Sequence, residues 1–195
     1  MHPPRIAIFA DGENLVLRFQ EMIDSGRRPL GDGFHEPDVC VWSPLLIWDP
    51  NNAEFQFVTR INYYTSVVGD APRVATVRDQ LSTREYICYP DATNRGVQHV
   101  GQLVPVVFKK PAKGQKTRNV DIQIIIDVMR CAHSDQFEQI HILSGDGDYL
   151  PLVKEVGHLG KQIRLSAFSS GLHPDLRRNV DRFTLLDDFY FEARR

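Results

Sequence analysis

Short apolar segments alternate with helix-like segments along this chain, and that alternation restricts the fold more than any other feature of the sequence. Each apolar or β-branched run has the length of a strand, and the stretches between carry apolar residues at helical spacing. Such alternation is typical of a parallel sheet whose right-handed crossovers place helices on both faces. We therefore expect an α/β, Rossmann-like three-layer fold with a central, mainly parallel sheet of about five to six strands. The expected strands are residues 5–10, 55–64, 85–89, 103–110, 139–144 and 162–167, and the expected helices are residues 14–23, 72–83, 120–132, 147–159 and 174–180.

The length of 195 residues fits one domain, residues 1–195, with two loop insertions. The first insertion, residues 27–53, holds four prolines and interrupts the alternation of strands and helices. We expect it to form a long loop with a short helix around residues 43–48. The second insertion, residues 90–102, is polar and contains glycine, which also predicts a loop.

Several segments carry expectations about packing. Pro105 lies within the strand 103–110 and indicates an edge position or a bulge, because proline cannot donate a backbone hydrogen bond. The helix 120–132 is apolar nearly all round, which predicts deep burial. Residues 63–65 are expected to end a strand, where a tyrosine would pack in the core or stack on a base. Residues 184–191 are expected to pack back on the body of the domain.

Composition restricts where the protein works and what it contacts. The formal net charge is −2, so overall charge does not indicate a nucleic-acid binder. No apolar run approaches membrane-spanning length, and we expect no association with membranes. The three cysteines are scattered and odd in number, which argues against a disulfide framework. We therefore expect a cytoplasmic protein. The sequence leaves open whether the chain forms a homodimer.

Four aspartates share a position at the ends of expected strands or at the start of an expected helix. Because the carboxyl ends of parallel strands meet at one edge of the sheet, we expect these side chains to converge there. Gathered carboxylates repel one another unless a cation holds them, and hard oxygen ligands suit Mg²⁺ or Mn²⁺. Asp11 follows residues 6–10, Asp146 and Asp148 follow residues 140–143, and Asp121 opens the helix 120–132.

Each of these aspartates also has a purely structural explanation. Asp11 and Asp146 could cap helices at tight turns, and Asp121 could interact favourably with a helix macrodipole. Two capping signals at strand ends, together with a third acid that opens a nearly all-apolar helix, favour a shared metal site. Asp127 lies six positions after Asp121 and faces another side of the helix, so we expect it to pair with Arg130 or Gln123 and to be a supporting or structural residue and not a metal ligand.

A basic stretch without acidic residues precedes Asp121. Such a run is most often a solvated loop. This one must pass near the acidic edge, where cations would draw in the phosphates of a polyanion. Its members are Lys109, Lys110, Lys113, Lys116 and Arg118.

These motifs together resemble the NYN domains, specifically the LabA-like branch of the PIN-like nuclease superfamily. The resemblance rests on the segment 6–15, on Tyr63-Tyr64-Thr65, on Val107–Lys110, on Asn119–Ile122 with Asp127–Met129, and on Leu143–Val153. It implies a PIN-like parallel sheet carrying acidic residues that bind Mg²⁺ or Mn²⁺ and cut RNA. By position, Asp11, Asp121, Asp146 and Asp148 match the acidic cluster, Asn14 matches its supporting polar residue, and Ser144 matches its small hydroxyl.

The chain departs from the family pattern before the helix aspartate. Arg118-Asn119 stands where relatives commonly carry Lys-Gly. The expected function is metal-dependent hydrolysis of single-stranded RNA, with Lys110, Lys116 and Arg118 near the phosphates. The alternative is a non-catalytic or weakly catalytic module of the LabA-like type that binds RNA or protein and regulates.

Overall fold

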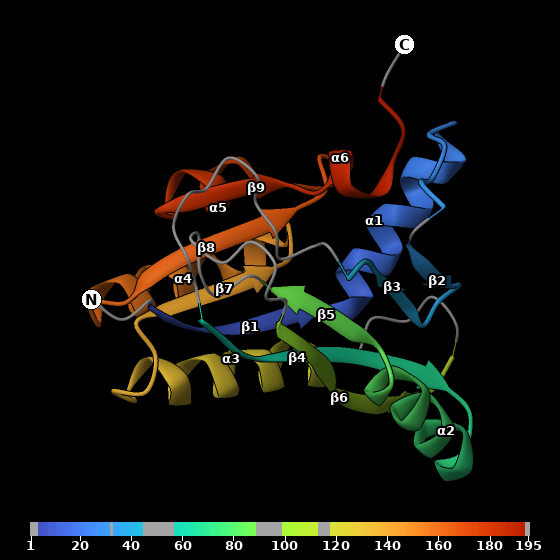
Figure 1. Cartoon of the computed structure of the whole chain (residues 1–195), viewed down its shortest axis with the longest axis horizontal. Helices are drawn as coiled ribbons and strands as arrows, with labels where there is room; N and C mark the ends of the chain where they lie inside the picture. The colour runs from blue at the N-terminus through green and yellow to red at the C-terminus, as the bar shows by residue number, and fades with distance from the viewer. Residues whose placement is uncertain (1–3, 32, 45–56, 89–98, 113–117, 194–195) are drawn as a thin grey trace.

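The computed structural model describes residues 4–31, 33–44, 57–88, 99–112 and 118–193. Its main element is a seven-stranded sheet of order β5-β6-β4-β1-β7-β8-β9 (Figure 1). Neighbouring strands pair in parallel, except that β5 and β6 pair antiparallel. The strands are β1 (Arg5–Asp11), β4 (Phe57–Val68), β5 (Glu85–Cys88), β6 (His99–Lys110), β7 (Gln139–Leu143), β8 (Gln162–Ala167) and β9 (Arg182–Leu185). The expected α/β fold with a mainly parallel sheet is confirmed, with one strand more than expected.

Helices cover both faces of this sheet and give the three layers. One face carries α1 (Gly12–Asp24) and α2 (Ala71–Ser82), which share a core with the side chains of β1 and β4 that point to that face. The opposite face carries α3 (Arg118–Ala132) and α4 (Leu150–His158), together with α5 (Pro174–Arg178). The short elements η1 (Gly147–Tyr149) and α6 (Asp187–Tyr190) complete the described helices.

The central strand β1 shows why the chain folds this way. Its apolar residues from Ile6 to Ala10 are all buried, because alternate side chains enter the two cores on opposite faces. A strand that is apolar on both faces is stable only between two layers of helices, which fixes β1 at the middle of the sheet.

Two strands extend beyond their predicted bounds. β4 continues to Val68, so Tyr63, Tyr64 and Thr65 lie inside the strand and not at its end. Both tyrosines are fully buried, which confirms that they are core residues and excludes base stacking by their rings in this structure. β9 is the additional strand, and it lies at the edge beside β8, where residues 182–185 pair with 164–167.

The prediction of a loop over residues 90–102 is wrong for its last part. Residues 99–102 belong to β6 and pair antiparallel with β5. Residues 99–102 are not predicted as a strand because the segment is polar. Backbone pairing with β5 and a close contact between Gly101 and Tyr86 stabilise the strand. A side chain at Gly101 would meet the Tyr86 ring at 2.3 Å, so only glycine allows the ring to lie there. Residues 90–98 lie outside the described part.

At Pro105, strand β6 has a neighbouring strand on one side and none on the other, within the described residues. The partner of Pro105 across the parallel ladder is Tyr63 of β4, while β5 pairs with β6 only up to Gln102. The backbone nitrogen of Leu103 donates to the carbonyl of Arg84, just before β5 begins, and Pro105 follows two residues later on the same side. The expected edge position is therefore correct for this part of the strand.

Residues 27–53 contain a small hairpin that the sequence did not indicate. The strands β2 (Phe34–Glu36) and β3 (Cys40–Trp42) pair antiparallel, and Asp38 at the turn has a positive φ of 61°. Trp42 is buried and its indole nitrogen donates to the carbonyl of Glu85 at 2.9 Å. The short helix expected around residues 43–48 falls mostly outside the described residues, since only residues 43 and 44 are described and neither is helical.

Helix α3 is less buried than its composition predicts. Val120, Ile124 and Val128 face the core, but Ile122, Ile125 and Ile126 are exposed by 52%, 37% and 39%. The expectation of burial all round is therefore wrong, because only one side of the helix meets the sheet.

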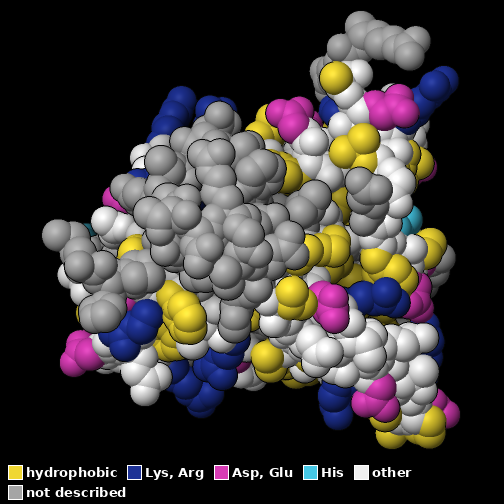
Figure 2. Space-filling model, viewed as in Figure 1, with side chains coloured by type: hydrophobic (Ala, Val, Ile, Leu, Met, Phe, Trp, Pro, Cys, Tyr) yellow, Lys and Arg dark blue, Asp and Glu magenta, His cyan; other side chains and the backbone are white. Residues whose placement is uncertain are grey.

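On the face seen in Figure 2, acidic and basic side chains are interspersed among hydrophobic ones over the described residues. That distribution agrees with the near-neutral net charge of −2. No helix in the described part of the chain has both the length and the apolar character needed to cross a membrane.

Candidate active site

The carboxyl ends of β1 and β7 lie side by side, as the sequence predicts. The two strands pair in parallel with Ala10 opposite Leu143, so Asp11 and Ser144 follow at the same edge of the sheet. The Ser144 hydroxyl donates to Oδ2 of Asp11 at 3.1 Å and accepts from the backbone N–H of Asp146 at 3.2 Å. One hydroxyl therefore links the aspartates that follow these two strands.

Asp11 also begins helix α1, so its expected structural role as a helix cap is correct. Its Oδ1 accepts from the backbone N–H of Asn14 at 3.0 Å, which is an N-cap hydrogen bond. Gly12 is required here because a side chain would meet the Tyr63 ring at 2.4 Å and the Tyr64 carbonyl at 2.6 Å. This close approach holds the start of the helix, and with it Asp11, against β4.

Asn14 acts on the neighbouring loop. Its side-chain oxygen accepts from the backbone N–H of Gly145 at 3.1 Å, which connects α1 to the segment between β7 and η1. Asp146 in turn caps η1, because its Oδ1 accepts from the backbone N–H of Asp148 at 3.1 Å. Asn14 matches the supporting polar residue of the family, and its contact with Asp11 is made by its backbone N–H.

Tyr149 brings Asp121 into this network. Its hydroxyl lies 3.2 Å from Oδ2 of Asp11 and 3.3 Å from Oδ1 of Asp121. Tyr149 is buried, whereas Asp121 lies in the first turn of α3. Sequence reasoning gave Tyr149 no role. The sequence contained one indication, that Tyr149 follows Asp146 by three residues. Asp146 caps η1, and Tyr149 at the end of that turn packs in the core.

Burial determines the charge state of Asp11. Removal from water raises the pKa of Asp11 to about 7, the hydrogen bond from Asn14 opposes this rise, and the nearby Asp121 carboxylate adds to it. Burial therefore favours the protonated form of Asp11 at pH values where an exposed aspartate is fully ionised. Burial and the same two carboxylates also raise the pKa of Tyr149, which keeps its hydroxyl protonated as a donor.

Through Ser144 and Tyr149, the carboxylates of Asp11 and Asp121 are connected to each other and to the backbone N–H of Asp146. The side chain of Asp148 is exposed, while its backbone is fixed by Asp146. Among the residues that the structure describes, no three acidic, histidine or cysteine side chains are gathered tightly enough to form a ready-made metal site. The donors are nevertheless all hard oxygens. Mg²⁺ usually keeps several waters and takes only one or two carboxylates, so the donor set fits this ion.

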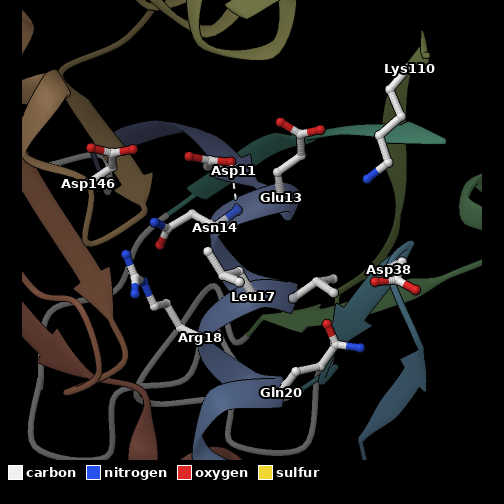
Figure 3. Close-up of a pocket in the computed structure, with 10 residues that line it drawn as sticks. Asp11, Glu13, Asn14, Leu17, Arg18, Gln20, Asp38, Lys110 and Asp146 are labelled. Atoms are coloured by element: carbon white, nitrogen blue, oxygen red, sulfur yellow. Dashed lines mark hydrogen bonds between the residues drawn. The ribbon is translucent and has the colours of Figure 1, made fainter. Parts of the chain in front are cut away.

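Of the predicted basic residues, the structure brings Lys110 to the site. Lys110 comes from the end of β6 and lines the same cavity as Asp11 and Asp146 (Figure 3). Arg118 is exposed at the start of α3, and Lys116 lies outside the described residues, as does Lys113.

The cavity also reveals residues that the sequence did not single out. Glu13 and Arg18 of α1 line it, with Arg18 on the side of Asp146 in Figure 3. The Ser66 hydroxyl donates to the Glu13 carboxylate, which connects α1 to β4. Helical spacing could have placed Glu13 and Arg18 near Asn14, but only the packed structure shows which side of α1 is open.

Asp127 lies outside this cluster, as expected. It accepts hydrogen bonds from the hydroxyl of Tyr64, from the amide of Gln123 and from the guanidinium of Arg130. These contacts attach α3 to β4 and confirm its structural role.

Comparison with known proteins agrees with this geometry. The family model of the NYN domain matches residues 5–187, which include every element of the site described above. The chain belongs to the NYN domain family. NYN domains are members of the PIN-like nuclease superfamily and are generally nucleases that use divalent metal ions.

A solved structure supports the same NYN fold. A Vibrio parahaemolyticus protein of unknown function is similar to this NYN chain over 98% of both chains, with a TM-score of 0.61 and 17% sequence identity. At this identity the likeness shows the fold. No curated protein matches the chain at a significant level.

Proposed function

We propose that this NYN protein is a metal-dependent ribonuclease that hydrolyses phosphodiester bonds of single-stranded RNA with the help of Mg²⁺ or Mn²⁺. The observation that carries this proposal is that the Tyr149 hydroxyl joins the carboxylates of Asp11 and Asp121, while the Ser144 hydroxyl joins the Asp11 carboxylate to the backbone of Asp146. Capping explains Asp11 and Asp146 individually, but it does not explain the buried Tyr149 hydroxyl that lies between the carboxylates of Asp11 and Asp121, which come from different elements.

Each residue has a role that follows from its surroundings. A divalent ion bound by these carboxylates would supply Lewis acidity, which activates water and neutralises charge on the phosphate. Lys110 and Arg18 line the cavity beside the acids and suit the flanking phosphates. We assign to Asp148, the exposed carboxylate two residues after Asp146, the role of taking the proton of the attacking water.

Metal dependence tests the proposal directly. The purified protein is incubated with end-labelled single-stranded RNA, the matching DNA and duplex RNA, in Mg²⁺, in Mn²⁺ or in EDTA. We expect cleavage of single-stranded RNA in at least one of these ions, complete loss in EDTA and recovery when Mn²⁺ is added in excess. Asp146→Asn protein purified in parallel reveals any contaminating nuclease. Absence of cleavage in both ions, or cleavage that EDTA leaves unchanged, would contradict the proposal.

Tyr149→Phe is expected to lower RNA cleavage at subsaturating Mn²⁺ by about 10- to 100-fold, as is common for groups that orient metal ligands. The hydroxyl that lies between Asp11 and Asp121 is lost, so the two carboxylates no longer hold their spacing. The measurement is the cleavage rate as a function of Mn²⁺ concentration, and the half-saturating concentration should rise.

Tyr64→Phe is the matched control for that substitution. It also removes a hydroxyl bonded to an aspartate of α3, but this aspartate is Asp127, outside the site. Its Mn²⁺ dependence should equal that of the unmodified protein. If both variants shift equally, Tyr149 has no special part in placing the metal ligands.

One observation favours a second function, a regulatory module of the LabA-like branch that binds RNA without cutting it. The described residues contain no preassembled group of three metal ligands. RNA binding with no cleavage in any ion would support this function. We place either activity in the cytoplasm, because the three cysteines are buried and free and suit a reducing compartment.

A further inference from the structure

The cavity beside the acidic residues continues well past them along helix α1. It has a volume of about 270 Å³ and is bordered on the far side by Lys110 of β6 and Asp38 of the hairpin turn. Figure 3 shows Asp11 and Asp146 at one end of this space, and Leu17 and Gln20 farther along the same helix. A second hollow shares Leu17 and Gln20 and extends the groove toward His35.

The helix presents a regular row of side chains to this groove. Glu13, Leu17 and Gln20 are spaced by four and then three residues, so they lie on one side of α1. Leu17 is 49% exposed although it is apolar and lies in the middle of the groove. By helix geometry, Leu17 lies about 9 Å along the axis from Asp11, which begins the helix.

The chemistry of the groove changes along its length. Arg18 lies on the side of Asp146 and Lys110 borders the far side of the cavity, and both cations suit phosphate. Farther along, the exposed face of Leu17 is flanked by the amide of Gln20 and the carboxylate of Asp38. An apolar surface with polar groups at its margin suits the flat face and hydrogen-bonding edge of a nucleobase.

We propose that this groove binds the base of the nucleotide next to the scissile phosphate, with the base lying on Leu17 and its edge facing Gln20 and Asp38. This inference rests on the proposed ribonuclease function, because the cavity is continuous with the proposed catalytic residues. Glutamine pairs well with adenine, and a carboxylate accepts hydrogen bonds from exocyclic amino groups. Adenine and cytosine carry such a group and uracil does not, so the site selects adenine and cytosine over uracil.

The test measures cleavage of labelled oligoribonucleotides of ten adenines, ten cytosines or ten uracils in Mn²⁺. We expect the adenine and cytosine substrates to have a kcat/KM about tenfold higher than the uracil substrate. Gln20→Ala should slow mainly the adenine substrate and leave the preference for cytosine over uracil, which depends on the Asp38 carboxylate. Leu17→Ala should lower all three by about tenfold, because the base covers less apolar side-chain surface.

Leu159→Ala is the matched control, because Leu159 is also an exposed leucine at 37% but lies after α4, away from the groove. It should leave all three substrates unaffected. Equal cleavage of the three substrates that neither Leu17→Ala nor Gln20→Ala changes would overturn the base site and leave the ribonuclease function intact.

If no RNA is cleaved, measurements of oligonucleotide binding still test the base site separately from the ribonuclease function. Fluorescence anisotropy of the same oligonucleotides is then measured with the Asp146→Asn protein and with Asp146→Asn combined with Leu17→Ala. Tighter binding of adenine and cytosine than of uracil, lost in the double variant, would support the base site. Equal binding of all three would overturn it.

Discussion

Asp146→Asn is expected to reduce metal-dependent RNA cleavage about a thousandfold or more. The substitution keeps the shape of the side chain and its ability to cap η1, since asparagine accepts the hydrogen bond from Asp148 equally well. What it removes is the negative charge proposed to hold the divalent ion, and metal ions supply several kcal/mol of transition-state stabilisation. The measurement is a single-turnover cleavage rate in saturating Mn²⁺, with circular dichroism to confirm the fold.

Asp70→Asn provides the matched control for this prediction. Asp70 caps α2 through the backbone N–H of Arg73, in the same way that Asp146 caps η1, but it does not line the cavity. Its asparagine variant should cleave RNA at the rate of the unmodified protein. Full activity in Asp146→Asn would show that the charge at this position has no catalytic part. Asp148→Asn, tested beside it, shows whether the exposed acid of the same turn contributes.

Asp11→Asn is expected to abolish cleavage and, in EDTA at pH 8, to raise the free energy of unfolding by about 2–4 kcal/mol. Asp11 is buried, and its pKa rises from the ordinary value of 3.8 to about 7 in the folded protein. Between those two values the folded state holds a proton that the unfolded state has released. Stability of the unmodified protein therefore falls as pH rises from about 4 to about 7, and the neutral variant avoids that loss.

The decisive measurement is how the difference in free energy of unfolding between Asp11→Asn and the unmodified protein changes with pH. Urea unfolding of both proteins at pH 4.5 and at pH 8 should show a small difference at the lower pH and the full difference at the higher one. Addition of Mn²⁺ at pH 8 should stabilise the unmodified protein and leave Asp11→Asn unaffected, because a ligand stabilises only the state that binds it. A variant that is less stable at both pH values would contradict the burial argument.

Most of the fold could be predicted because the patterns that indicate strands and helices lie within short segments of the sequence. Continuous apolar runs identified β1 and β7, helical spacing identified α1 and α3, and their alternation gave the parallel sheet. The errors occurred where distant contacts dominate. Residues 99–102 form a strand because β5 pairs with them, and the hairpin β2–β3 pairs over only three residues on each side.

The residues of the candidate site also fall into those that the sequence predicts and those that only distant contacts reveal. The ends of the apolar runs and the resemblance to NYN domains point to Asp11, Asp121 and Asp146 from the sequence alone. Tyr149, which lies between two of them, was missed because a buried tyrosine in a short helix has no sequence signature of its own. Glu13 and Arg18 were missed for a related reason, since exposure on one side of α1 depends on what packs against the other sides.

The sequence by itself determined the layered α/β plan and the edge of the sheet at which aspartates gather, because strand direction and strand ends are encoded by neighbouring residues. Only the tertiary structure decided that Ser144 and Tyr149 join those aspartates, that burial raises the pKa of Asp11 to about 7, and that a groove runs on along α1 past Leu17. Hydrogen bonds, desolvation and open space all arise between residues far apart in the chain, and no local pattern records which of them will meet.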